Sequence, residues 1–367
     1  MKQKNTIYIL LCACLLVLNS CGGSKVDQDE VKKANQFFES IFQDRVLDSP
    51  EFQTRLGYKS NYDQWDDITW TKRRKNVRNA EFDLEYMLDN INIEKLDSKT
   101  SISYRLMEKS LQRIIDSNEY LFRGYMVTHR GGKHSSIPSF LINYHKIDDE
   151  RDVKDYLSRL RNIEPLFEDF IKELELRDEL GTIPPMFVYP KAIAVCENII
   201  SGYPFEETEK QNVIYEDFVN KLDALDISDA LKLRYKSEAE AILVTVVNYS
   251  YKNLIDFLAK QQLNATNNDG VWKYPDGAEY YQYTLDQYTT LGLTAEEIHE
   301  IGLSEVARIH EEIYAIMEEV AFEGTLQEFF DFMRTDPQFY YPQSDKGRQM
   351  YLDQVNVVVD TLSARID

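Results

Sequence analysis

The chain has 367 residues, of which 43% are apolar and 29% are charged. This mixture excludes a disordered chain, a collagen and a small disulfide-knotted protein. Only 14 Gly and 10 Pro leave little material for the many tight turns of an all-β fold. The chain has 42 Lys and Arg residues and 63 Asp and Glu residues, which gives a formal net charge of −21. Because such an acidic surface repels phosphate backbones, we expect no nucleic acid partner.

The start of the chain has the pattern of a lipoprotein signal peptide. Lys2 and Lys4 precede an apolar run over residues 7–18, which is shorter than the roughly 20 residues that span a bilayer. The string Leu18-Asn19-Ser20-Cys21 then resembles a bacterial lipobox. The resemblance implies cleavage before Cys21 and acylation of its thiol and amine. An ordinary cleaved signal peptide beside an incidental Cys is the alternative.

These features predict how the chain is organised. Residues 1–20 are a lipoprotein signal peptide, residues 21–30 a lipidated tether and residues 31–367 one helical domain. Acyl chains on Cys21 would make the lipid bilayer a partner and place the protein in the bacterial cell envelope, either in the periplasm or on the cell surface. After processing, Cys196 is the remaining thiol, so no internal disulfide is expected. Its apolar, helical-looking segment predicts a buried structural Cys and not a nucleophile.

The rest of the chain predicts a mainly α fold. Apolar residues recur with helical spacing in residues 30–46, 69–95, 101–122, 150–176 and 237–262. The β-branched patch over residues 243–247 could form a strand, but its flanks favour a helix. Two capping boxes, Thr294 with Glu297 and Thr325 with Glu328, predict two later helix starts. No repeat or low-complexity linker divides the chain, so one helical body is the simplest interpretation.

The apolar segment over residues 355–366 needs cover, either from the rest of the chain or from residues that this chain does not contain. An exposed apolar helix promotes self-association. We therefore expect the isolated protein to associate with itself.

The five histidines do not form a recognisable metal motif. A metallopeptidase helix sets two His four residues apart with a Glu between them. His310 and Glu311 begin such a motif, yet Tyr314 stands at the second position. The loop over residues 129–136 carries basic groups and backbone donors, so it could meet an anion. A solvated loop is the alternative that we favour for it.

The densest unusual stretch covers residues 272–281, where aromatic hydroxyls flank a glycine turn. Such side chains suit a wall that binds peptide or sugar, and they equally suit a helix–loop junction in a core. Composition alone does not separate the two interpretations.

This stretch also resembles a known family. Pro275-Asp276-Gly277-x-x-Tyr280-Tyr281, Thr289-Thr290, and Leu293-Thr294-x-Glu296-Glu297-Ile298-His299-x-x-Gly302 look like the bacterial family named domain of unknown function 885. His134-Ser135-x-x-Pro138, Tyr156-Leu157-x-Arg159-Leu160 and residues 181–187 fit the same family. The similarity runs from about residue 35 to the end and keeps the family's order of segments.

The resemblance implies a large, helical, zincin-like fold related to zinc carboxypeptidases, and a metal-dependent peptidase activity. The family's metal motif, a His-Glu stretch running into Pro-Gly-His, has no match in this chain. No catalytic residue and no metal ligand can therefore be carried over, and zinc is implied only for the full-length family. Five residues match family positions and are candidates for substrate binding: Tyr280, Tyr281, Thr289, Thr290 and His299.

Two functions follow from the sequence. The first is the substrate-side, N-terminal portion of a zinc peptidase, incomplete at its C-terminus, anchored by lipid and inactive alone. The second is a non-catalytic helical lipoprotein that binds peptides or a protein partner. Both expect a possible peptide ligand and no cofactor held by this chain.

Overall fold

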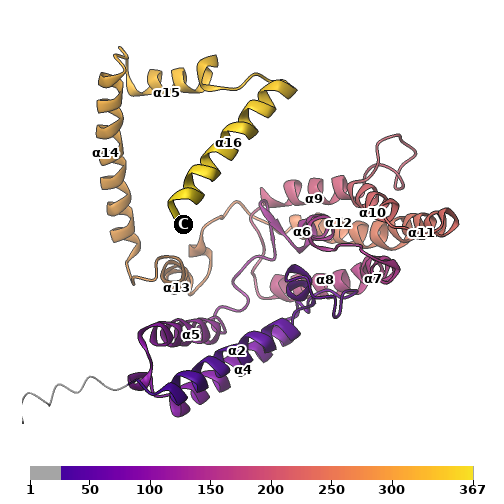
Figure 1. Cartoon of the computed structure of the whole chain (residues 1–367), viewed down its shortest axis with the longest axis horizontal. Coiled ribbons are helices and arrows are strands. Elements are labelled where there is room, and N and C mark those ends of the chain that lie inside the picture. Colours follow the sequence, from indigo (N-terminus) through magenta and orange to yellow (C-terminus); the bar gives the residue numbers. More distant parts are fainter. Residues whose placement is uncertain (1–25, 367) are drawn as a thin grey trace, which may run out of the picture. The chain divides into compact units, whose positions relative to one another are not determined.

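The computed structural model describes residues 26–366, and it confirms the prediction of a mainly α fold (Figure 1). Chain contacts divide it into two compact units, which we call unit 1, ending at Tyr280, and unit 2, starting at Tyr281. Among the described residues, no helix is both long and apolar enough to cross a bilayer.

Unit 1 begins with three long helices and then forms a larger helical body. Its elements are α2 (Gln28–Leu47), α3 (Pro50–Arg55), α4 (Trp70–Asn90), η1 (Ile93–Lys95), α5 (Ser98–Asp116), β1 (Val127–Thr128), β2 (Gly131–Gly132), α6 (Lys133–Tyr144), α7 (Glu150–Arg161), α8 (Ile163–Glu179), α9 (Val188–Ile199), α10 (Val213–Asp223), α11 (Asp229–Ile242), η2 (Leu243–Val247), α12 (Asn248–Gln262) and η3 (Val271–Lys273). The two short strands pair in an antiparallel hairpin.

The helices α2, α4 and α5 pack through one apolar stripe from each. Ala34 on α2, Met87 on α4 and Tyr104 on α5 belong to one buried cluster. Each helix starts at a side-chain cap: the carboxylates of Asp27 and Asp97 and the hydroxyl of Thr69 accept backbone N–H groups of the first turn. The stretch predicted to be helical over residues 101–122 ends earlier, at Asp116, and turns follow it.

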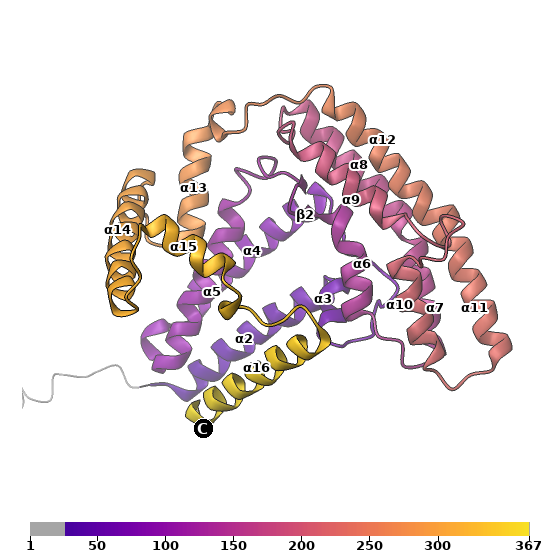
Figure 2. The ribbon, with the colours of Figure 1, turned by 90° about the horizontal axis from the view of Figure 1, so that it is seen from above.

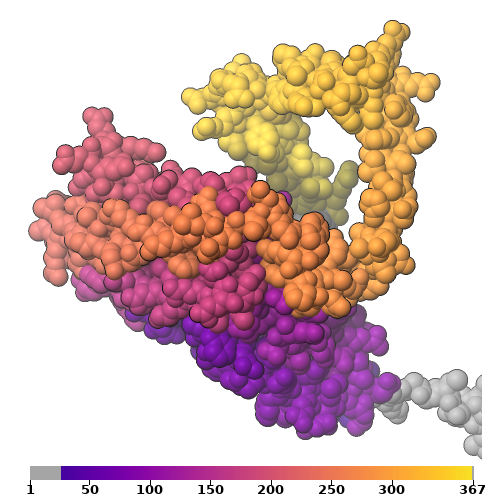
Figure 3. Space-filling view, turned by 180° about the vertical axis from the view of Figure 1, so that it is seen from behind, coloured from indigo at the N-terminus to yellow at the C-terminus, as the bar shows by residue number. Residues whose placement is uncertain are grey.

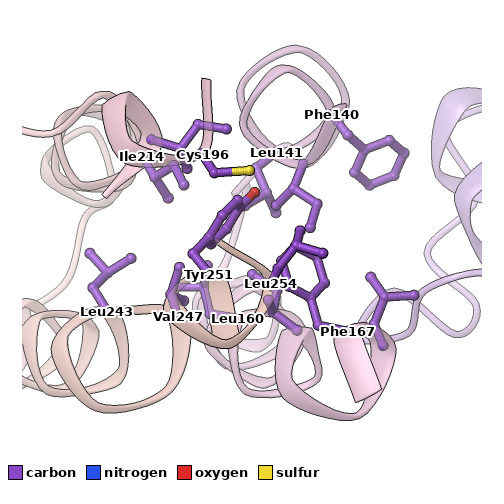
Figure 4. Packing of buried hydrophobic residues seen from close by; sticks show 14 of the residues in the cluster. Phe140, Leu141, Leu160, Phe167, Cys196, Ile214, Leu243, Val247, Tyr251 and Leu254 are labelled. Atoms are coloured by element: carbon purple, nitrogen blue, oxygen red, sulfur yellow. The ribbon is translucent and has the colours of Figure 1, made fainter. Parts of the chain in front are cut away.

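The main core of unit 1 lies among α6, α8, α9 and α12, and Figures 1 and 2 show α8, α9 and α12 side by side. Figure 4 shows Tyr251 of α12 and Cys196 of α9 inside this core. Cys196 is fully buried, as predicted, and burial raises the pKa of its thiol to about 12. The thiol is therefore protonated and packs as a small apolar group.

Two local features depart from regular helix. Residues 150–176 hold two helices, α7 and α8, which meet at Asn162, and the side chain of Asn162 donates to the carbonyl of Asp63 (3.0 Å). The patch Leu243–Val247 is helical, as expected, and forms a π turn between α11 and α12. Leu243 and Val247 are both buried there.

Arg159 on α7 is completely buried and lies at the centre of a hydrogen-bond network. Its guanidinium donates to the carbonyl of Gln64 (2.8 and 3.0 Å), to the hydroxyl of Thr54 (3.1 Å) and to Nδ1 of His145 (2.9 Å). The charge also lies 5.1–5.5 Å from the centres of three aromatic rings, those of Tyr62, Trp65 and Phe140. Arg159 therefore ties α7 to the segment before α4, which gives one family-matching motif a structural role.

Unit 2 consists of helices with little core of their own. They are α13 (Gly277–Thr289, which begins in unit 1), α14 (Ala295–Glu319), α15 (Leu326–Thr335), η4 (Pro337–Phe339) and α16 (Asp345–Ile366). Both predicted capping boxes, at Thr294 and Thr325, are present. Among the described side chains of unit 2, Met317 and Phe329 are the buried large apolar ones. In the space-filling view, α14 forms a narrow column (Figure 3).

The predicted apolar segment near residue 355 belongs to α16 and is exposed. Val357, Val358, Val359 and Leu362 each keep about half of their surface exposed, at 57%, 48%, 52% and 52%. The described side chains of α16 are exposed along nearly its whole length. The expectation that it promotes self-association remains a prediction.

Candidate functional site

The five residues that match family positions lie on α13, directly after it and on α14. Tyr280 lies in unit 1, where its ring is 5.3 Å from the ring of Tyr120. Tyr281 and Thr290 are exposed, and the hydroxyl of Thr289 donates to the carbonyl of Leu285 on its own helix. His299 is exposed on α14. The role of these five residues in substrate binding remains a prediction.

The segment before α13 docks on the loop that follows α5. Arg123 and Asp276 form a bidentate ion pair, with Nη2 to Oδ1 at 2.7 Å and Nε to Oδ2 at 3.1 Å. The hydroxyl of Tyr274 donates to that of Tyr125 (3.1 Å), and the Arg123 guanidinium lies 4.9 Å from the centre of the Tyr274 ring. These contacts explain Asp276 in the predicted motif as a structural anchor.

Gly277 is required there because the backbone passes too close for a side chain. A Cβ atom at this position would lie 2.1 Å from the carbonyl oxygen of Val271. The turn over residues 274–277 is closed by a hydrogen bond from the Gly277 N–H to the Tyr274 carbonyl (3.1 Å). This part of the unusual stretch is thus a packed junction, which was one of the two interpretations of the sequence.

The second family motif begins at the β1–β2 hairpin. Gly132 has a φ of 155°, and a Cβ atom on it would lie 2.4 Å from the carbonyl oxygen of Met126. Two residues later, His134 is buried, with 1% of its surface exposed, and the hydroxyl of Tyr251 donates to its carbonyl (3.0 Å). The favoured expectation of a solvated loop is therefore wrong at His134, because α12 and α6 enclose it.

His134 is held as a neutral imidazole. Burial lowers its pKa to about 4, since the charged ring would lose its hydration. Its Nδ1 atom has no hydrogen-bond partner within the described part of the chain. A histidine in this state packs against the hairpin and is shielded from any ligand in solution.

Unit 1 contains a polar cavity of about 460 Å³, which we call the Arg73 cavity and which is lined from α4, α6, α8, the segment before α4 and the loop after α5. This volume suits a small ligand or the end of a peptide. Tyr125 belongs to the loop that receives the segment before α13, and Lys133 opens α6. The cavity is lined by Asp66, Asp67, Ile68, Arg73, Gly124, Tyr125, Met126, Lys133 and Phe170.

Most charged groups of this cavity are already paired. Lys133 forms an ion pair with Glu51 and lies 4.9 Å from the centre of the Trp65 ring. The carboxylate of Asp66 accepts the Ser49 hydroxyl (2.7 Å) and the Glu51 N–H (2.9 Å). Burial raises the pKa of Asp66. Two charged groups of the lining lie outside this network: Asp67, whose carboxylate accepts the Thr69 N–H (2.9 Å), and Arg73.

Arg73 could not be found from the sequence. It is one of four adjacent basic residues in the first turns of α4, and such residues usually face solvent on an amphipathic helix. In the structure it is half-buried beside α8 and forms no hydrogen bond or ion pair through its guanidinium with the described residues. Its position depends on residues a hundred places away, which no local pattern reveals.

Two other hollows are less suited to a ligand with charge. A groove of about 710 Å³ runs between α6 and α9 and is lined mainly by apolar, hydroxyl and amide side chains, with Lys210 as its charged member. A hollow of about 250 Å³ shares Asp66, Asp67 and Ile68 with the Arg73 cavity. The lining of the second hollow has no Lys or Arg, and Lys210 in the first is exposed.

No described part of the chain gathers the ligands of a metal. Over residues 26–366, no group of three His, Cys, Asp or Glu side chains lies close enough to share an ion. A zinc ion in a peptidase needs three such ligands and an open position. Among the described residues, the side chains therefore do not fit a zinc ion.

Comparison with known proteins supports the motif assignment. The family described as "Bacterial protein of unknown function (DUF885)" matches residues 50–367. A search of curated proteins found no match.

Two solved structures share the fold. A protein from Colwellia psychrerythraea described as a "putative lipoprotein" has 21% identity and a TM-score of 0.78, over 93% of this chain and 59% of that one. A "putative lipoprotein of unknown function" from Shewanella oneidensis has 15% identity and a TM-score of 0.59, over 90% of this chain and 57% of that one. The chain therefore spans less than three fifths of the length of each of these structures. From the family match across most of its length, the chain belongs to the DUF885 family.

Proposed function

We propose that this protein is a lipid-anchored envelope protein whose helical body binds peptides and, by itself, does not cut them. The observation that carries the proposal is the Arg73 cavity, because it brings together charged side chains from segments distant in the sequence, such as Asp66, Arg73 and Lys133. The cavity combines polar groups with the apolar side chains of Ile68, Met126 and Phe170, as peptide-binding sites do.

The peptidase resemblance supports the choice of ligand. A protein that forms the substrate side of a zinc peptidase would bind peptides without supplying the metal. The resemblance assigns no zinc ligand to this chain, and the proposed function needs no cofactor. A zincin-like ancestry and a peptide ligand are both parts of the proposal.

Peptide binding is tested with the full acylated chain in detergent micelles. We expect short unmodified peptides, such as tetra-alanine, to bind in isothermal titration calorimetry with dissociation constants of roughly 1 mM to 1 μM, the usual range for a small, open site. Peptide hydrolysis, followed by mass spectrometry of the same samples, should stay at the level of buffer. Steady cleavage by metal-loaded protein would contradict the non-catalytic part of the proposal.

Anchoring is tested at Cys21, which lies outside the described residues. The proposal is supported by the lipobox in the sequence and by the descriptions of the two solved structures. In a bacterial host fed a tagged fatty acid, the wild-type protein should carry the label and sediment with membranes. Cys21→Ser should lose both properties, whereas the matched control Cys14→Ser should keep both. Label retained by Cys21→Ser would show that another residue carries the lipid.

A further inference from the structure

The strongest unexplained feature of unit 1 is the charge of Arg73. Two buried residues of α8, Glu173 and Arg177, lie beside it. Arg177 donates from Nη1 to Oε2 of Glu173 (2.8 Å), and the N–H of Trp70 donates to Oε1 (2.7 Å). Both oxygens of the Glu173 carboxylate are therefore already engaged.

The local charges do not cancel. One carboxylate, that of Glu173, stands against two guanidinium groups, so the cluster carries an excess positive charge. Burial and the charge of Arg177 lower the pKa of Arg73, while Glu173 opposes this only in part. A half-buried cation without a counterion is unfavourable, and it is relieved when an anion binds beside it.

The unpaired guanidinium lines the wall of the Arg73 cavity. The other cation of the cavity, Lys133, is neutralised by Glu51. Asp66 and Asp67 on the same lining place negative charge near the ligand. These acids would repel a dianion such as phosphate but tolerate a single negative charge that Arg73 neutralises.

A carboxylate meets these conditions. It carries one charge, and its two oxygens match the planar fork of a guanidinium. The side chains of Ile68, Met126 and Phe170 offer apolar contact to the group that bears the carboxylate. We propose that the Arg73 cavity binds the carboxylate of its ligand, with the guanidinium of Arg73 as the direct partner.

This inference rests on the proposed function, of which it names the anchoring group. The carboxylate could come from the C-terminus of a peptide or from a free carboxylic acid. Calorimetry with four probes separates the sources: tetra-alanine with free termini, the same peptide with a C-terminal amide, propionate and inorganic phosphate. The free peptide should bind wild-type protein at least about tenfold more tightly than the amide, because hydrogen bonds to charged groups are worth about 1.5–3 kcal/mol.

Three variants assign the effect to one residue. Arg73→Gln should bind the free and amidated peptides equally, and Arg73→Lys should keep part of the preference, since it keeps the charge but not the fork. Arg78→Gln is the matched control, because Arg78 is exposed on the same helix and undergoes the same change of charge. It should behave as wild type. Far-UV circular dichroism of each variant checks that the helices are intact.

Each other outcome overturns a defined statement. If peptides bind but amidation and Arg73→Gln change nothing, the carboxylate site is wrong while the proposed function stands. If propionate binds in an Arg73-dependent way and peptides do not, the ligand is a free acid and the peptide proposal falls. A preference for phosphate, or no binding of any probe to wild-type protein, refutes the carboxylate site.

Discussion

Arg159→Ala is expected to lower the free energy of unfolding by about 3–5 kcal/mol, the usual cost of removing one partner from a buried charged network. The substitution leaves the carbonyl of Gln64, the hydroxyl of Thr54 and Nδ1 of His145 without their donor. It also removes a side chain that is fully enclosed by aromatic rings. Urea unfolding followed by circular dichroism measures the loss.

A control separates the network from the charge. Arg159→Lys keeps the positive charge but reaches fewer of the acceptors, so it should recover only a minor part of the stability. Arg161→Ala on the same helix is the matched surface control, because Arg161 forms an ion pair with the partly exposed Glu238. A wild-type unfolding midpoint for Arg159→Ala would show that the hydrogen-bond network of Arg159 contributes nothing to stability.

Acidification is expected to produce the second large effect, through two buried histidines. Burial lowers the pKa of His134 to about 4 and that of His145 to about 2, and the positive charge of Arg159 adds to the shift of His145. In the unfolded chain both imidazoles titrate near pH 6.5. Their contribution to stability is therefore complete above about pH 6.5 and is lost as the pH falls towards 4.

The size of this loss follows from the shifts. Each pKa unit corresponds to about 1.4 kcal/mol, so two units of acidification below pH 6.5 should cost about 2–3 kcal/mol for each histidine. Urea midpoints at pH 7, 6 and 5 measure the slope. The buried carboxyl groups of Asp66 and Asp217 have raised pKa values and change stability in the opposite direction, so the comparison uses variants.

His134→Gln and His145→Gln should each flatten the dependence, and the double variant should remove most of it between about pH 5 and 7. The matched control is His299→Gln, because His299 is exposed on α14. If the double variant keeps the wild-type slope, the histidines do not control the acid sensitivity of unit 1.

The sequence predicted those features that depend on neighbours along the chain. The capping boxes at Thr294 and Thr325 need only a hydroxyl and a Glu three residues later, and both form. The apolar period around Cys196 predicted its burial. The helical character of Leu243–Val247 followed from its flanks, although the π turn did not, because a π turn has no simple sequence pattern.

The features that the sequence missed depend on distant partners. His134 is enclosed through Tyr251, which is 117 residues away, and α7 and α8 separate where Asn162 reaches Asp63, 99 residues away. The Arg73 cavity depends on Glu173, which is 103 residues from the Trp70 N–H that it accepts. Local periodicity carries no information about such pairs.

Because Cys196 is buried, its thiol can report local opening of the core of unit 1. A thiol that is fully enclosed and protonated can meet an alkylating reagent only after α9 separates from its neighbours. When closing is faster than alkylation, the labelling rate scales with the population of that open form. The labelling rate of Cys196 in each proposed variant would then report how that substitution changes the free energy of opening the core of unit 1.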